Sequence, residues 1–175
     1  MSMPELPEDL FLDGIAELVR TDRRWIPTDE GTALYIRPTM MGIDPFLGVK
    51  AADEYLFFVI LSPVGPYFAE GFNPIPLYVC REYTRAAPGG TGEAKAGGNY
   101  AGSLLAGKLA RDKGCSQVLW LDAKERKYVE EVGAMNIWFA FGNTLVTPPL
   151  EGTILPGVTR DALLELAPTL GYEIE

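Results

Sequence analysis

The sequence of 175 residues contains no histidine, which excludes serine-protease-like triads and zinc sites with imidazole ligands. It has two cysteines, Cys80 and Cys115, too few for a disulfide framework and without the spacing of metal ligands. Basic residues are outnumbered, since 15 Lys and Arg stand against 24 Asp and Glu and the formal net charge is −9. Because nucleic-acid binding requires a basic surface, we expect no nucleic-acid partner, and any chemistry must proceed without imidazole.

Long apolar runs are also missing. The longest, at residues 55–61, is far shorter than the ~20 residues that a membrane-spanning helix needs. Residues 1–5 carry neither a basic segment nor the apolar core of an export signal. We therefore expect a cytoplasmic protein without a membrane segment.

Proline and glycine are concentrated between residues 63 and 76, which include four prolines and two glycines. Such a stretch is typical of a linker between domains. The length of the chain and its hydrophobic content of 47% suit one ordinary domain or two small ones. The sequence therefore predicts an N-terminal domain at residues 1–63, an interdomain linker at 64–76 and a larger domain at 77–175.

Hydrophobic periodicity predicts both helices and strands. Helices are expected from about residue 8 to the segment 25–27, at 100–113 and at 159–170, and strands at 33–40, 55–61, 77–80 and 117–121. A meander is expected at 128–132, 137–141 and 144–146. Gly114 and Gly171 would end the last two helices. Because strands and helices do not alternate strictly, we expect an α/β or α+β fold with a mixed or antiparallel sheet.

One lysine lies inside a run dense in glycine, at residues 89–100. Glycine permits positive φ angles and the close approach of a ligand to the backbone. The ammonium of Lys95 is therefore a candidate nucleophile or phosphate contact beside the start of the next helix. The alternative is a flexible connector with a solvated lysine.

Three further features suggest chemistry. Glu131 lies where a predicted strand turns, and the backbone N–H groups of Val158 and Thr159 open the last helix, where anions bind. Tyr35 and Arg37 would share one face of a strand. Each has an ordinary alternative, namely a surface acid, a loop-to-helix junction capped by Thr159, and a cross-strand pair. Together with the lysine, they supply the parts of a pyridoxal phosphate site.

Seven motifs resemble the branched-chain amino-acid aminotransferases, which are fold-type IV enzymes dependent on pyridoxal 5′-phosphate. They follow the family's order from about residue 10 to residue 172, and this order is more specific than any single motif. The motifs are LYIRP at 34–38, LSPVGPY at 61–67, KAGGNY at 95–100, QVLWL at 117–121, EVGAMN at 131–136, TPPL at 147–150 and ILPGVTR at 154–160.

The resemblance implies roles for five residues at the cofactor. Lys95 matches the family's Schiff-base lysine, which also moves the proton between Cα and C4′. Glu131 matches the carboxylate that pairs with the pyridine nitrogen. Tyr100 matches the tyrosine that is hydrogen-bonded to the phenolic oxygen of the ring. Val158 and Thr159 match the backbone donors to the phosphate.

The resemblance also implies a substrate side. Tyr35 and Arg37 match residues near the substrate pocket, and Leu47 matches a rim residue that reaches into the partner subunit's site. Ala134 stands where relatives often carry threonine. The implied protein is a homodimer of branched-chain amino-acid biosynthesis, with a mostly apolar pocket. It exchanges the amino group reversibly between L-leucine, L-isoleucine or L-valine and 2-oxoglutarate.

Relatives carry segments that this chain lacks, namely an N-terminal segment with a phosphate-binding arginine and a C-terminal loop at the cofactor and the substrate carboxylate. We therefore expect the small domain at 1–63 and the pyridoxal phosphate domain at 77–175 to be partial. The alternatives are a catalytically incomplete fragment that binds cofactor or dimerises, and another fold-type IV enzyme, such as a D-amino-acid aminotransferase or an aminodeoxychorismate lyase.

Overall fold

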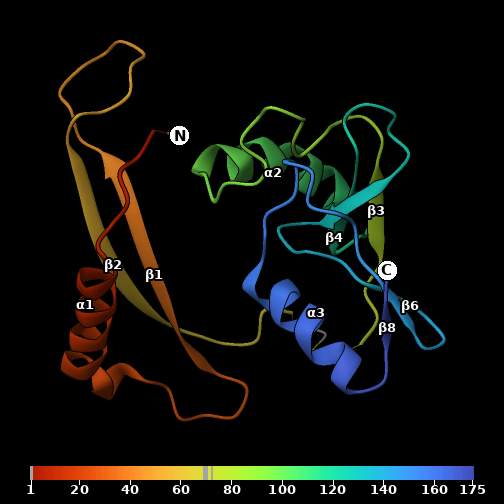
Figure 1. Ribbon diagram of the computed structural model, residues 1–175, viewed down its shortest axis with the longest axis horizontal. Helices are drawn as coiled ribbons and strands as arrows, with labels where there is room; N and C mark the ends of the chain where they lie inside the picture. Colours follow the sequence, from red (N-terminus) through yellow and green to blue (C-terminus); the bar gives the residue numbers. More distant parts are fainter. Residues whose placement is uncertain (1, 69–70, 72) are drawn as a thin grey trace. The chain divides into compact units, whose positions relative to one another are not determined.

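The segment rich in proline and glycine is also where the chain passes from one compact unit to another. The computed structural model describes residues 2–68, 71 and 73–175, and its units are Met1–Asn73 and Pro74–Glu175 (Figure 1). The boundary falls within the predicted linker at 64–76, of which residues 69, 70 and 72 lie outside the described residues. Each unit is described by itself below.

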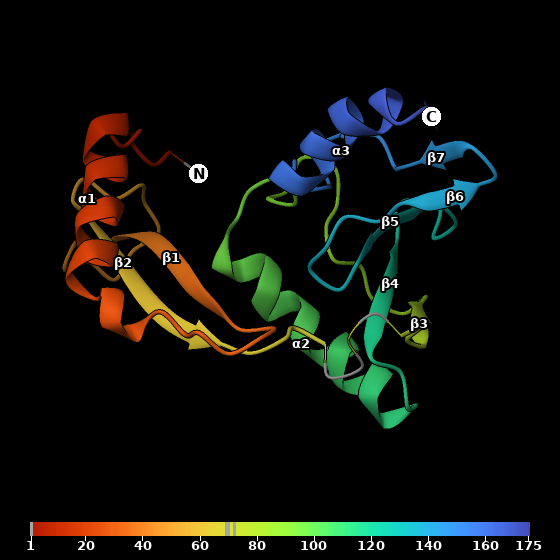
Figure 2. The ribbon, with the colours of Figure 1, turned by 90° about the horizontal axis from the view of Figure 1, so that it is seen from below.

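The first unit is a long β-hairpin with one helix. Strands β1 (Ala33–Gly42) and β2 (Tyr55–Val64) pair in antiparallel fashion, with Tyr35 opposite Ser62. Helix α1 (Glu8–Thr21) has acidic residues in its first turn, where their negative charge interacts favourably with the positive end of the helix dipole. The short 3₁₀ helix η1 (Arg23–Trp25) follows it. Figure 2 shows α1 beside the hairpin, and the rings of Phe11 and Phe57 lie 6.0 Å apart.

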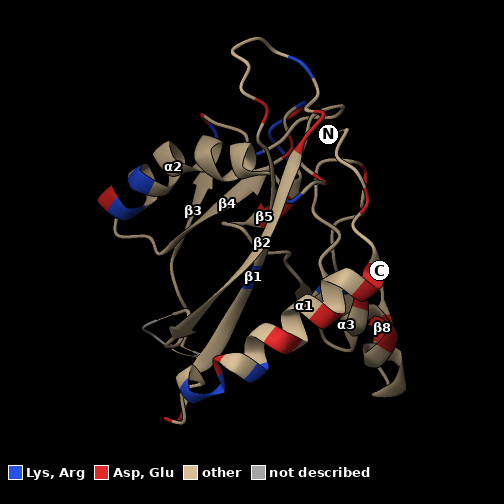
Figure 3. Ribbon diagram, turned by 90° about the vertical axis from the view of Figure 1, so that its left-hand side faces the viewer, with Lys and Arg blue, Asp and Glu red and all other residues tan. Residues whose placement is uncertain are grey.

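The two faces of the hairpin differ. Phe57, which contacts α1, stands opposite Met40, whereas Tyr35 and Arg37 occupy alternate positions on the other face. Acidic residues are spread over α1 and the C-terminal elements rather than gathered in one cluster (Figure 3). Among the described residues, no helix is both long and apolar enough to cross a lipid bilayer.

The second unit contains a three-stranded sheet in the order β3-β4-β5. Strand β3 (Leu77–Cys80) runs parallel to β4 (Gln117–Leu121), and β5 (Val129–Val132) runs antiparallel to β4. Parallel neighbours need a crossover connection, which here is helix α2 (Gly97–Asp112). The core of this unit consists of Cys80, Ala106, Ala110, Val118 and Trp120, so the small residues of α2 pack on the sheet.

A second sheet has the order β6-β7-β8. Strands β6 (Phe139–Phe141) and β7 (Thr144–Val146) form a hairpin, and β7 runs parallel to β8 (Glu173–Ile174) after helix α3 (Val158–Thr169). The predicted meander is right for its last two strands, because β6 and β7 pair as expected, and wrong for the first, because β5 pairs with β4 and not with β6. The cause is a tight turn at Gly133, which has a φ of +57° and donates its N–H to the carbonyl of Val118.

The mixed α/β class is confirmed, whereas two helix starts differ from the prediction. Helix α2 begins at Gly97 rather than at residue 100, and α3 begins at Val158 with Gly157 as its N-cap. The glycines predicted to follow these helices do so, with φ values of +75° at Gly114 and +87° at Gly171. Strand β8 was not predicted, because two residues carry no periodicity.

Candidate functional site

The glycine loop places Lys95 directly before helix α2. Its Nζ donates a hydrogen bond to Tyr100 Oη at 3.0 Å, because helical side chains lean back toward the N-terminus of their helix. The side chain of Asn99 holds the loop in shape, donating to the carbonyls of Thr91 at 2.6 Å and Ala94 at 2.8 Å. Lys95 is exposed, so its ammonium remains open to a ligand.

Glu131 on β5 is buried, with 2% of its surface exposed. Its Oε2 lies 2.7 Å from Arg85 Nε, and its Oε1 accepts hydrogen bonds from the N–H of Leu155 at 3.0 Å and from Asn136 Nδ2 at 3.3 Å. Burial raises the pKa of the Glu131 carboxyl above its usual value, while the Arg85 guanidinium and the Leu155 N–H oppose this rise. The carboxylate is thus surrounded by donors in an environment that excludes water.

Arg85 is itself fixed by other bonds. Its Nη2 donates to the carbonyl of Thr153 at 2.5 Å and to that of Gly92 at 3.2 Å. Only 8% of its side chain is exposed. A buried guanidinium needs partners on several of its five N–H groups, and these carbonyls fix the plane in which Nε faces Glu131.

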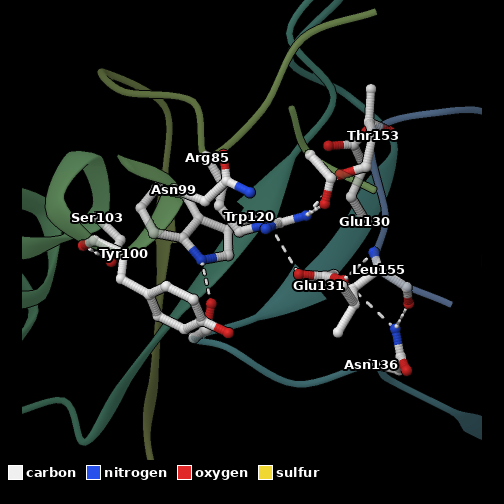
Figure 4. A network of polar contacts seen from close by, with 12 residues as sticks. Arg85, Asn99, Tyr100, Ser103, Trp120, Glu130, Glu131, Asn136, Thr153 and Leu155 are labelled. Carbon is white, nitrogen blue, oxygen red and sulfur yellow. Dashed lines mark hydrogen bonds and ion pairs between the residues drawn. The ribbon is translucent and has the colours of Figure 1, made fainter. Parts of the chain in front are cut away.

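The side chains of Glu131 and Tyr100 line the same pocket (Figure 4). Ala134 also lines it, whereas Lys95 reaches it through the hydroxyl of Tyr100. Gly133 has a φ of +57°, a left-handed conformation that favours glycine, and a Cβ atom there would also displace the side chain of Gln117. The other lining residues are Arg85, Ala94, Asn99, Ser103, Gly133 and Leu155.

The start of α3 is tied to the same carboxylate. Asn136 Nδ2 donates to the carbonyl of Leu155 at 2.9 Å as well as to Glu131, and a Cβ atom at Gly157 would clash with Asn136 Oδ1. Because Gly157 provides no side-chain cap, the first N–H groups of the helix remain available to an anion. Val158 is 86% exposed, and Thr159 is exposed as well.

The alternative in which Thr159 caps this helix is wrong, because α3 already begins at Val158. The predicted phosphate donors Val158 and Thr159 are not among the residues that line the pocket. They follow the lining residue Leu155 in the chain by three and four positions. Their role at a phosphate stays a prediction.

The predicted substrate residues of the first unit lie on β1 and in the loop after it. The guanidinium of Arg37 lies 5.1 Å from the centre of the Tyr35 ring, so these two side chains share one face as expected. Leu47 is fully exposed between β1 and β2. The assignment of these three residues to a substrate pocket stays a prediction.

Several residues of this site were not found from the sequence. Arg85 and Thr153 hold the carboxylate network together, and Asn136 links Glu131 to the segment before α3. Asn136 was visible as the last residue of the EVGAMN motif. Arg85 offered a weaker signal, as a lone cation in the stretch 85–90 that is otherwise alanine, proline and glycine.

Comparison with known proteins gives consistent results. The probable branched-chain-amino-acid aminotransferase of Streptomyces coelicolor is 53% identical over 176 residues, which cover 100% of this chain and 49% of that protein. Among solved structures, the Escherichia coli branched-chain amino acid aminotransferase superposes with a TM-score of 0.80 at 32% identity, over 99% of this chain and 55% of that one.

A third similar structure is the branched-chain amino acid aminotransferase of Thermobaculum terrenum in its PLP form, that is, the holo form with pyridoxal 5′-phosphate. Its TM-score is 0.74 at 25% identity, and the match covers 99% of this chain and 54% of that one. The chain thus spans about half the length of the relatives it matches. The family described as amino-transferase class IV matches residues 2–175. The chain therefore belongs to the class IV aminotransferases.

Proposed function

We propose that the protein is a branched-chain amino-acid aminotransferase that uses pyridoxal 5′-phosphate. One observation carries this proposal: the Lys95–Tyr100 pair and the buried carboxylate of Glu131 meet at a single pocket. The names of the similar proteins support it, as does the holo form of the T. terrenum enzyme.

The residues present fit the cofactor. A carboxylate offers about four lone-pair positions, and Glu131 uses two of them, on Oε1, for the hydrogen bonds from Leu155 and Asn136, while its Oε2 forms an ion pair with Arg85. One position remains for the N–H of a pyridinium ring. The N–H groups at the start of α3 suit a phosphate, and Lys95 supplies an amine.

Each residue then has a defined task. When bound, pyridoxal phosphate supplies an electron sink for the charge that develops at the substrate Cα. Lys95 would bind the cofactor aldehyde and carry the proton to and from Cα. Tyr100 would orient the ammonium and the ring oxygen, and Glu131 would keep the ring nitrogen protonated by its negative charge. Val158 and Thr159 would hold the phosphate.

We propose L-leucine, L-isoleucine and L-valine as amino donors and 2-oxo acids, including 2-oxoglutarate, as acceptors. Gly133 and Ala134 line the pocket beside Glu131, and the roles of Tyr35, Arg37 and Leu47 at the substrate follow from the resemblance alone. That the protein acts as a cytoplasmic homodimer stays a prediction. The second candidate is a chain that binds cofactor without turnover, and it is favoured by the position of Lys95, which is not among the residues that line the pocket.

Absorbance spectra of the purified protein with added pyridoxal phosphate test both candidates. We expect a cofactor band that shifts on addition of L-leucine but not of D-alanine. A shift with D-alanine alone would indicate a D-amino-acid aminotransferase, and a bound cofactor that no amino acid shifts would indicate the second candidate. Lys95→Ala should remove the shift, whereas Lys108→Ala, which removes an exposed lysine paired with Asp112, should retain it.

Borohydride reduction followed by peptide mapping gives an independent reading of the same site. We expect the reduced cofactor on Lys95. A tag on Lys108, Lys113 or Lys124 would contradict the assignment of the glycine loop.

A further inference from the structure

Strand β5 carries two neighbouring carboxylates, and both are buried. Glu130 is 9% exposed and Glu131 is 2% exposed. Because neighbouring residues of a strand point to opposite faces, only Glu131 lines the pocket with Tyr100. Glu130 faces away from that pocket, toward a surface formed with Thr153, Tyr128 and Pro149. None of the tasks proposed above uses Glu130.

The two carboxylates are nevertheless joined by a chain of short polar contacts (Figure 4). Thr153 Oγ1 donates to Glu130 Oε1 at 2.6 Å, and the carbonyl of the same threonine accepts from Arg85 Nη2 at 2.5 Å. Arg85 Nε then lies 2.7 Å from Glu131 Oε2. Thr153 is 4% exposed, so water does not compete for these contacts.

We propose that Glu130 is a positioning residue, which acts on Glu131 through Thr153 and Arg85. Glu130 fixes the hydroxyl of Thr153, and this fixes the carbonyl that orients the guanidinium. In the described part of the chain, Glu130 Oε2 has no hydrogen-bond partner, so Thr153 supplies the only donor to this carboxylate. The effect of Glu130 on Glu131 does not require a cofactor, whereas its role in catalysis rests on the proposed function.

Glu130 exerts two opposite effects on Glu131. Its negative charge raises the pKa of Glu131, whereas the Arg85 that it helps to position lowers it. The charged groups that act on the pKa of Glu131 are Arg85 and Glu130, and Tyr100, which is hydrogen-bonded to Lys95, lines the same pocket as Glu131. Variants that separate charge from hydrogen bonding therefore distinguish the two effects.

The test is a carboxyl titration of the cofactor-free protein by NMR with ¹³C-labelled glutamate, in which the Glu131 signal is assigned by its loss in Glu131→Gln. Glu130→Gln removes the charge but retains an oxygen acceptor for Thr153, so the Glu131 midpoint should fall. Glu130→Leu removes both, so its midpoint should lie above that of Glu130→Gln. Equal midpoints in these two variants would overturn the proposal.

Thr153 provides a second, independent pair of variants. Thr153→Val removes the donor to Glu130 and should raise the Glu131 midpoint by about one pH unit, a tenfold change in the protonation equilibrium. Thr153→Ser retains the hydroxyl and should titrate like the wild type. If a folded Thr153→Val variant has the wild-type midpoint, Thr153 does not position Arg85 and the proposal fails.

A matched control removes another buried hydroxyl outside the network. Thr147 is 8% exposed and donates to the carbonyl of Ile137 at 2.8 Å. Thr147→Val should leave the Glu131 midpoint unchanged, and a shift equal to that of Thr153→Val would show a general effect of packing instead. Circular dichroism spectra establish that each variant is folded.

Cofactor binding provides the separate reading of the proposed function. If the wild-type protein binds no pyridoxal phosphate while the titrations shift as expected, the proposed function fails and the positioning of Glu131 stands. If the cofactor binds and the titrations do not shift, the coupling fails and the proposed function stands.

Discussion

A carboxylate as deeply buried as Glu131 is stable in its charged form only when donors surround it. Its three donors come from three segments of the chain, namely Arg85 after β3, Asn136 after β5 and Leu155 before α3. Since burial raises the pKa of this carboxyl, loss of any one donor would move it further toward the neutral form. The charge of one side chain thus depends on how the whole second unit folds.

The two neighbouring glutamates should respond differently to loss of charge. Glu131→Gln should reduce turnover of L-leucine with 2-oxoglutarate by roughly 10²-fold or more, the usual effect of removing a charge-stabilising contact at a reacting centre. Glu130→Gln should cost far less, because its amide oxygen still accepts from Thr153. Steady-state rates of the two variants measure this difference. Equal losses of turnover would contradict the assignment of Glu131, rather than Glu130, to the cofactor.

At this scale the sequence predicted roles for Lys95, Tyr100 and Glu131 because each lies in a motif that is local in the chain. Arg85 could not be identified in this way. Its contact with the Thr153 carbonyl joins residues 68 positions apart, and no local pattern states that an arginine is buried. Long-range contacts of this kind are fixed by the packing of several elements and not by the residues that flank them.

The predicted site residues lie at the ends of their helices and strands. Lys95 precedes α2, Glu131 lies one residue before the end of β5, and Val158 and Thr159 start α3. At a helix start the N–H groups have no intrahelical partner, so this position suits a phosphate without any side chain.

Substitutions at Thr159 should therefore distinguish main-chain from side-chain contacts. Because Thr159 lies inside α3 and does not cap it, Thr159→Ala should change cofactor affinity by less than ~0.5 kcal/mol, as expected for an exposed position. Thr159→Pro retains the helix, since proline is tolerated in the first turn, but removes a donor. The loss of a charge-assisted hydrogen bond costs ~1.5–3 kcal/mol, so affinity should fall roughly tenfold or more.

Titration of cofactor absorbance measures both variants of Thr159. Equal affinities in Thr159→Ala and Thr159→Pro would place the phosphate elsewhere. A large loss in Thr159→Ala alone would indicate a contact through the hydroxyl.

The turn between β4 and β5 depends on one partly exposed acid. Asp122 accepts four backbone hydrogen bonds, from the N–H groups of Lys124, Glu125, Lys127 and Tyr128. These bonds, the one from Glu125 most of all, lower the pKa of Asp122 well below its usual value. A lowered pKa means that the stabilisation is present above the ordinary aspartate pKa and is lost as the pH falls through the lowered one.

Asp122→Asn should therefore lower the free energy of unfolding at neutral pH, and the difference from the wild type should shrink as the solution becomes strongly acidic. Urea unfolding at several pH values measures this. Asp13→Asn, on the exposed side of α1, is the control and should show no such trend. A difference for Asp122→Asn that is the same at every pH would mean that its charge is not involved.

Element by element, the sequence predicted strands well where apolar residues are continuous, as in β2 and β4. It failed where pairing is decided at a distance. The segments of β5 and β6 look like neighbours in a meander, but the turn at Gly133 directs them into different sheets. The start of α2 was predicted too late, because Gly97 and Gly98 are poor helix formers and packing of Ala106 and Ala110 overrides that propensity.

On the scale of the whole molecule, the hairpin of the first unit exposes apolar side chains, with Ile60 at 51% and Tyr35 at 43%. Surfaces of this kind promote association between molecules. The purified chain should therefore associate in solution at micromolar concentration.

Size-exclusion chromatography measures this association. Elution of the chain as a monomer at micromolar concentration would contradict the association.

The core of the second unit contains a thiol at its centre. Cys80 is 0% exposed, whereas Cys115 is partly exposed, and the chain has no other cysteine. A thiol reagent should therefore modify Cys115 at once and Cys80 only when the sheet opens around it. The rate of the slow phase reports how often the unit that carries Lys95 and Glu131 opens. Comparing this rate with and without cofactor would measure, in the native sequence, how much a bound ligand stabilises this unit against opening.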